Sequence, residues 1–179
     1  LLKGIQKKYK YMWYLRERCW CEEKTLKLMY QAVCGDHDLV FMDVGHPEGK
    51  VELSICNNAN EFYHRCGDYA TSMDTAIYNI DRMLGDNLSI ENFHQKYDYE
   101  YRATFLFFLI VFEQLSKIEK PDICLLAGNK VTIYHSILGH SSWGDRRLEV
   151  WGKCWIGANQ ELPECYDGRE KIIKRTASF

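Results

Sequence analysis

The sequence predicts one α+β domain spanning residues 1–179, with a mixed or antiparallel sheet packed against helices. Residues 5–33 contain neither proline nor glycine and are rich in long unbranched side chains, which favours a helix. Residues 39–55 and 123–137 hold short runs of β-branched and apolar side chains, which favour strands. A chain of 179 residues, 46% of them apolar, can bury one core, and this composition excludes a disordered protein.

Apolar spacing and turn residues set the expected order of the elements. Helices are predicted over 5–33 and 71–84, strands over 39–44, 50–55, 123–126, 130–137 and 147–156, and a short helix or frayed end over 171–179. Gly35 and Gly85 stand where the two helices are expected to end. The first helix is expected to break near residues 20–22.

The first two strands are predicted to pair as a β-hairpin, because turn-forming residues at 45–49 separate them. The pattern from Asp43 to Gly49 also fits a loop that binds a nucleotide or S-adenosylmethionine. Such a loop leads into a helix, whereas here a strand pattern follows. The hairpin is therefore the preferred interpretation.

Residues 102–120 form the most apolar segment, and Pro121 ends it. The pattern fits a central buried helix and also a central strand that leads into a helical turn; periodicity does not separate the two. The uninterrupted apolar run covers only residues 105–112. A bilayer span needs about 20 residues, so no membrane partner is expected.

The eight cysteines bear on the compartment. Their spacing is irregular and no Cys-x-x-Cys pair occurs, so nothing in the sequence indicates a zinc ribbon or a thioredoxin-type site. We expect mostly reduced, buried thiols in an intracellular protein of the cytoplasm or nucleus. Paired cysteines would instead indicate a secreted protein. The formal charge of −2 gives no strong preference for an acidic or basic partner.

His37 is the first candidate site residue. It lies among Asp36, Asp38 and Asp43, and this set of oxygen and nitrogen ligands suits a hard divalent cation. The alternative is a solvated junction between a helix and a strand.

Glu113 and Lys117 are four residues apart in the apolar segment. A carboxylate and an amine in apolar surroundings can form a catalytic pair. The alternative is an ordinary ion pair on the polar end of a helix, which contributes about 0.3 kcal/mol.

Aromatic and basic residues gather at 97–102. Tyr97 and Tyr99 could stack on bases while Arg102 contacts phosphates, which predicts a nucleic-acid contact; the alternative is core packing. Separately, Cys19 could form a thiol–imidazole dyad with His135 or His140, if the fold brings them together.

A similarity to a known family runs over roughly residues 25–140 and is carried by residues 32–42, 63–65 and 97–102. In these stretches the chain resembles the N-terminal cap-snatching endonuclease domain of the orthomyxovirus polymerase acidic subunit. The resemblance implies an RNA-associated domain of a viral RNA polymerase, with RNA or polymerase subunits as partners. It also implies two Mn²⁺ or Mg²⁺ ions that activate water.

The family's metal ligands map only in part onto this sequence. His37 matches the metal-binding histidine and Asp68 the first acid, and Asp98 is displaced by a few positions from the expected place of the next acid. Lys117 or Lys120 could serve as the lysine. A further acid falls in the apolar run, where no carboxylate occurs. Because affinity for hard cations follows ligand charge, the resemblance implies impaired or lost cleavage.

Two alternatives stay open beside the endonuclease. The chain also resembles ribosome-inactivating RNA N-glycosidases, in which Tyr78 would stack on adenine and Glu113 would stabilise the ribosyl transition state. The family's arginine, three residues after the glutamate, is here Ser116. The third alternative is a non-catalytic protein-interaction module.

Overall fold

The structure is a computed structural model, and it describes residues 8–15, 19–43, 52–83, 95–96, 103–127, 133–135 and 145–176. The described helices are α2 (Glu23–Cys34), α3 (Ala59–Cys66), α4 (Ile80–Met83), α7 (Leu106–Leu115), α8 (Trp155–Gln160) and α9 (Arg169–Thr176), with helical turns η1 (Tyr69–Thr71), η2 (Met73–Thr75) and η3 (Leu148–Cys154). The described strands are β1 (Tyr11–Trp13), β2 (Cys19–Cys21), β3 (Leu39–Asp43), β4 (Glu52–Cys56), β5 (Ala76–Asn79), β6 (Ile123–Ala127) and β7 (Ile133–His135). The α+β fold class predicted from the sequence is confirmed.

Five strands form one mixed sheet in the order β1-β5-β3-β6-β4, and β2 and β7 form a separate two-stranded sheet. β3 and β6 run parallel, whereas the other neighbours in the larger sheet run antiparallel. The predicted β-hairpin of the strands at 39–44 and 50–55 is wrong, because β6 lies between them. Four successive residues of β6 are buried, as a central strand covered on both faces requires.

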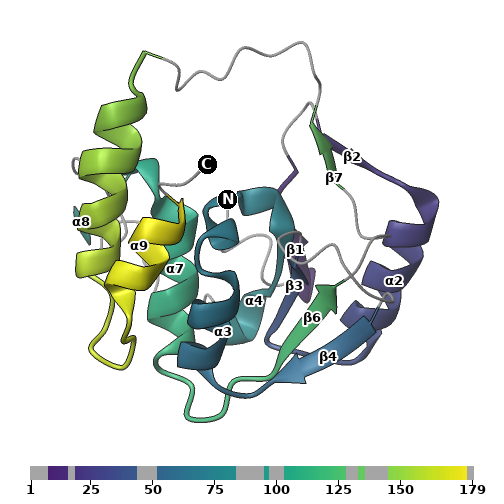
Figure 1. Cartoon of the computed structure of the whole chain (residues 1–179). Helices are drawn as coiled ribbons and strands as arrows, with labels where there is room; N and C mark the ends of the chain where they lie inside the picture. The colour runs from purple at the N-terminus through teal and green to yellow at the C-terminus, as the bar shows by residue number, and fades with distance from the viewer. Residues whose placement is uncertain are drawn as a thin grey trace.

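Helices cover both faces of the larger sheet (Figure 1). α2 lies on one face, and α3, α7, α8 and α9 form a thicker layer on the other. Side chains alternate between the faces along β3. Leu39 and Phe41 therefore join the core under the thicker helical layer, whereas Val40 and Met42 join the core under α2.

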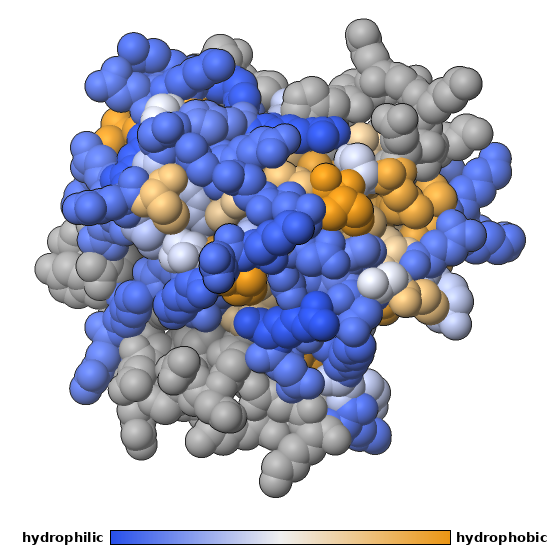
Figure 2. Space-filling view, turned by 90° about the horizontal axis from the view of Figure 1, so that it is seen from below, coloured by the Kyte–Doolittle hydropathy of each residue, from blue (hydrophilic) through white to orange (hydrophobic). Residues whose placement is uncertain are grey.

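The face under α2 has an uncovered margin at the edge strand β4. Leu53 and Ile55 are 46% and 50% exposed, although they align with Leu126 and Cys124, which are buried under α2. Figure 2 shows hydrophobic residues interrupting the hydrophilic surface on the side of α2 and β4. At this edge, the apolar side chains of Leu53 and Ile55 are exposed to solvent next to the outer strand of the sheet.

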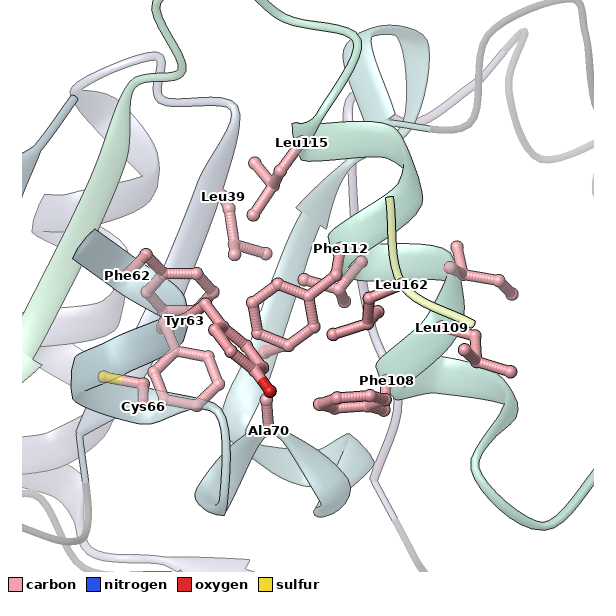
Figure 3. Close-up of a cluster of buried hydrophobic side chains, with 14 of the residues drawn as sticks. Leu39, Phe62, Tyr63, Cys66, Ala70, Phe108, Leu109, Phe112, Leu115 and Leu162 are labelled. Carbon is pink, nitrogen blue, oxygen red and sulfur yellow. The ribbon is translucent and has the colours of Figure 1, made fainter. Parts of the chain in front are cut away.

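The core under the thicker helical layer is built around aromatic rings from several elements (Figure 3). The ring of Phe112 lies 5.5 Å from Phe62, 5.3 Å from Tyr63 and 4.8 Å from Phe108, between ring centroids. The Tyr166 hydroxyl donates a 2.7 Å hydrogen bond to the carbonyl of Phe112. Of the two alternatives for the apolar segment, the buried helix is therefore correct: it is α7.

The helix predicted over residues 5–33 is wrong in its first part. β1 and β2 are strands, and the helix begins at Glu23, near the predicted break, and ends at Cys34 with Gly35 as its C-cap. β1 pairs with β5, so that Tyr11 and Trp13 pack on the core under α2 while Met12 packs on the opposite core. Pairing and two-sided packing override the local helix propensity.

Two further predictions are wrong for the same kind of reason. The helix predicted over 71–84 is confirmed over α4 but is wrong over β5, whose residues are all buried and pair with strands on both sides. The strand predicted over 147–156 is helical and covers η3 and the start of α8. Helical spacing there places Trp151 and Trp155 on one face, and both rings contact Phe105.

The described thiols are free, and four of them are buried, namely Cys56, Cys66, Cys124 and Cys154. No helix in the described part of the chain is long and apolar enough to cross a membrane. The compartment stays a prediction.

Candidate functional site

His37 lies between α2 and β3, where the parallel strands β3 and β6 begin. Its Nδ1 is 3.0 Å from Oδ2 of Asp122, at an angle outside hydrogen-bond geometry. On the other side of the ring, a Cβ on Gly35 would come within 2.3 Å of Nε2. The backbone of Gly35 therefore lies close to Nε2, and the carboxylate of Asp122 lies beside Nδ1.

The neighbouring aspartates are held by basic side chains. Lys10 Nζ lies 2.5 Å from Oδ1 of Asp36, and this hydrogen bond is the main cause of a lowered pKa for that carboxyl. Arg82 lies 3.1 Å from Oδ1 of Asp38 and also donates to the carbonyl of Asp36. The other oxygen of Asp38 accepts the backbone N–H of Asp122 at 2.8 Å. Asp36 and Asp38 of the predicted acidic cluster therefore belong to an ion-pair network that Asp122 joins, whereas Asp43 lies at the other end of β3.

Asp68 belongs to a different cluster. Its buried carboxylate accepts two hydrogen bonds of 2.7 Å from the guanidinium of Arg175, and the same guanidinium donates to the carbonyl of His64. This fork joins the end of α3 to α9, which closes the helical layer. The structure brings Asp68 together with Arg175, and it places His37 beside Asp122.

Glu113 lies near the end of α7, with only 13% of its side chain exposed. Its carboxylate pairs with the amine of Lys96, a partner that the helical spacing did not suggest. Lys117 is exposed one turn further along the chain. The catalytic pairing of Glu113 with Lys117 stays a prediction.

Several predicted site residues lie outside the described residues: Tyr97, Asp98, Tyr99 and Arg102. Within the ranges that the structure describes, no group of three or more histidine, cysteine, aspartate or glutamate side chains is placed to hold a metal ion. The predicted metal site and the predicted nucleic-acid contact therefore stay predictions.

An exposed histidine–carboxylate pair has no signal in the sequence, because its members are 103 residues apart. His64 Nε2 contacts Asp167 Oδ1, and its ring lies on Gly168, where an added Cβ would be 2.5 Å from Cε1. Hydrogen bonding to Asn60, and then to His64, lowers the pKa of Asp167. Gly168 has φ +61°, a backbone conformation that favours glycine, and a side chain at this position would collide with the His64 ring. Glycine therefore permits this contact.

The two-stranded sheet brings together two residues that the sequence analysis paired. β2 and β7 are antiparallel, and Cys19 is directly opposite His135 in their register. This register aligns the backbone of Cys19 with that of His135, whereas His140 lies outside the described residues, so the thiol–imidazole dyad stays a prediction. Cys21 lies two residues further on, half-buried against the core under α2, and burial raises the pKa of its thiol.

No relative assigns a role to these residues: the chain matches no protein-family model, no curated protein and no solved structure. The ion pairs of Asp36, Asp38 and Asp68 hold elements together.

We expect Mn²⁺ to leave the melting temperature of the reduced protein unchanged. The carboxylates of Asp36, Asp38 and Asp68 already pair with lysine or arginine, and a metal ion would have to displace these partners. Thermal melting followed by circular dichroism, with Mn²⁺ and with Ca²⁺ as a control, measures this. A rise in melting temperature with Mn²⁺ that His37→Ala abolishes would contradict the expectation and favour the two-metal endonuclease.

Proposed function

We propose that this chain is a protein-interaction module, and that it associates with a second copy of itself through the edge strand β4. The observation that supports this is the exposure of Leu53 and Ile55, at 46% and 50%, on an edge of the sheet. Among the described strands, β4 pairs with β6 alone. Edge strands with exposed apolar side chains readily add another strand.

Along β4, residues on one face turn toward the core and residues on the other face are exposed. Ser54 and Cys56 turn toward the core under the thicker helical layer, and Cys56 is buried there. Leu53 and Ile55 lie on the α2 side and face solvent. An added strand would shield these two side chains and would also satisfy main-chain groups along the edge.

A second copy fits this edge because the strand is self-complementary. When β4 pairs antiparallel with itself about Ser54, Leu53 lies opposite Ile55 of the second copy, and Ile55 opposite its Leu53. A two-fold axis therefore covers all four apolar side chains at once. The small formal charge of −2 opposes such pairing only weakly.

The contacts of the predicted catalytic residues favour this function over the two enzymes. Asp68 is occupied by Arg175, which weakens the case for a metal-dependent endonuclease with RNA or polymerase subunits as partners. Glu113 is paired with Lys96, whereas the glycosidase needs a carboxylate open to the ribosyl group. Tyr78 is 2% exposed, which leaves little surface for stacking on adenine.

Sedimentation equilibrium tests the proposal. We expect the full chain to form dimers, and Leu53→Glu/Ile55→Glu to weaken dimerisation by about 100-fold or more, because burying each side chain contributes about 1.5–3 kcal/mol. Leu53→Lys/Ile55→Lys is expected to do the same. Leu148→Glu is the matched control, because Leu148 is 89% exposed on η3 and is expected to leave dimerisation unchanged.

Mixing the two charged variants distinguishes strand pairing from other modes of association. In the proposed register each lysine lies opposite a glutamate, so the mixture is expected to form heterodimers although each variant alone is monomeric. A monomeric wild-type chain, unaffected variants, or a mixture that stays monomeric would each overturn the proposal.

A further inference from the structure

The helix that η3 and α8 form together lies on the outer side of the thicker helical layer (Figure 1). One row of its residues, spaced four apart, is buried in the core and consists of Val150, Cys154 and Ala158. A second row with the same spacing is displaced from the first by two residues, or about half a turn. This outer row therefore points away from the core, and it consists of Leu148, Gly152 and Ile156.

Two members of the outer row are apolar and exposed. Leu148 is 89% exposed, the largest fraction among the large apolar side chains of the described residues, and Ile156 is 38% exposed. Eight residues of helix separate them, which is roughly 12 Å along the axis. The row is thus long enough to contact two turns of another helix, which would remove both side chains from water.

Gly152 lies between Leu148 and Ile156, and the fold of the chain does not require a glycine there. A Cβ added at this position would have no described atom within 4 Å, and the φ of Gly152 is not positive. Glycine destabilises the interior of a helix relative to alanine. The close approach of another molecule explains it, because a side chain here would fill the space between the two apolar residues.

The helical geometry at this place is also unusual. η3 is a π-helix over Leu148–Cys154, and π-helices are rare and often occur at functional sites. The rare geometry, the exposed leucine and the unexplained glycine therefore coincide on one surface.

The charges beside the outer row indicate the chemistry of a partner. Arg146 and Glu149 form an ion pair of 2.7 Å, in which the two charges offset each other. Of the other charged residues along η3, Arg147 and Lys153 are exposed and outnumber the exposed Asp145. A net positive surface around an apolar row is complementary to an apolar stripe flanked by carboxylates.

We propose that the outer row docks an acidic amphipathic helix of another protein. The apolar stripe of that helix would cover Leu148 and Ile156 and approach closely at Gly152, while its carboxylates face Arg147 and Lys153. This surface belongs to the thicker helical layer, whereas the β4 edge belongs to the sheet. Docking here does not depend on association through β4.

A labelled synthetic peptide tests the surface by fluorescence anisotropy with the full chain. The probe is an amphipathic helix of about 15 residues, with leucines at every third or fourth position and glutamates on both flanks. We expect it to bind, and Leu148→Glu to weaken binding by more than about tenfold, because the leucine is no longer buried. The same peptide with lysines in place of the glutamates is expected to bind more weakly, and added salt is expected to reduce the difference.

Gly152→Leu distinguishes docking from a structural role of the glycine. Leucine has space in the free chain and is the better helix former, so we expect an equal or higher melting temperature together with loss of peptide binding. Leu26→Glu is the matched control, because Leu26 is 47% exposed on α2 and the substitution is expected to leave peptide binding unchanged.

Several results would overturn the proposal. They are no binding of the acidic peptide, equal binding of both peptides, binding that survives Leu148→Glu, or a lower melting temperature of Gly152→Leu. Weaker self-association of Leu148→Glu in sedimentation equilibrium would instead make the outer row an interface between copies of this chain. Binding to phosphatidylserine vesicles that Leu148→Glu abolishes would make it a membrane-binding surface, and either result would overturn docking of a partner helix.

Discussion

Phe112→Ala is expected to lower the free energy of unfolding by about 4 kcal/mol, which is typical of a phenylalanine removed from a packed core. Phe112 is fully buried, and its ring touches Phe62, Tyr63, Phe108 and Tyr166, which come from three separate parts of the chain. Alanine would leave a cavity that these rings cannot fill without losing their own contacts. Urea unfolding followed by circular dichroism gives the free energy directly.

Phe107→Ala is the matched control for this substitution. Phe107 precedes Phe108 on the same helix but is only half-buried. We expect Phe107→Ala to lower the free energy of unfolding by less than half as much as Phe112→Ala does. The slope of that free energy against urea concentration is expected to be the same for both variants. Equal losses for the two variants would contradict the position of Phe112 at the centre of the core.

Arg175→Ala is expected to lower the free energy of unfolding by about 3 kcal/mol, at the lower end of the range for breaking a buried ion pair. Only 1% of the Asp68 side chain is exposed, whereas 33% of the Arg175 side chain is exposed. Removing Arg175 leaves a buried carboxylate without this guanidinium. Asp68→Ala leaves an arginine that can turn to water, so it is expected to cost less.

A double-mutant cycle tests this asymmetry. The double variant Asp68→Ala/Arg175→Ala is expected to be more stable than Arg175→Ala alone, because it no longer buries the charge. Urea unfolding of the four proteins measures the coupling. If the two single losses simply add, the fork of two hydrogen bonds does not hold α9 on α3.

The fold class followed from local patterns, but the arrangement of the strands did not. Runs of apolar residues predicted β3 and β6 correctly, and Gly35 predicted the end of α2. The hairpin prediction failed because nothing in the sequence near β3 and β4 shows that β6 lies between them. β1 and β5 were missed because their pairing, rather than their propensity, makes them strands.

For the candidate sites too, the sequence indicated the residue types, whereas the structure showed their neighbours. The sequence singled out His37, Asp68 and Glu113 for their chemistry. Asp68 and Glu113 pair with Arg175 and Lys96, and His37 lies beside Asp122. Whether a carboxylate is free to bind a metal or held by a cation depends on such partners. The alignment of Cys19 with His135 likewise arises only in the folded sheet.

By itself, the sequence determined the α+β class, the buried helix as one of two readings, and the residue types available for chemistry. Those properties depend on composition and on the spacing of apolar residues, which are local. Only the tertiary structure decided the strand order, the edge position of β4, the ion pairs that occupy the predicted acids, and the register that aligns Cys19 with His135. Each of these depends on contacts between distant segments, and such contacts form only when the chain buries its core.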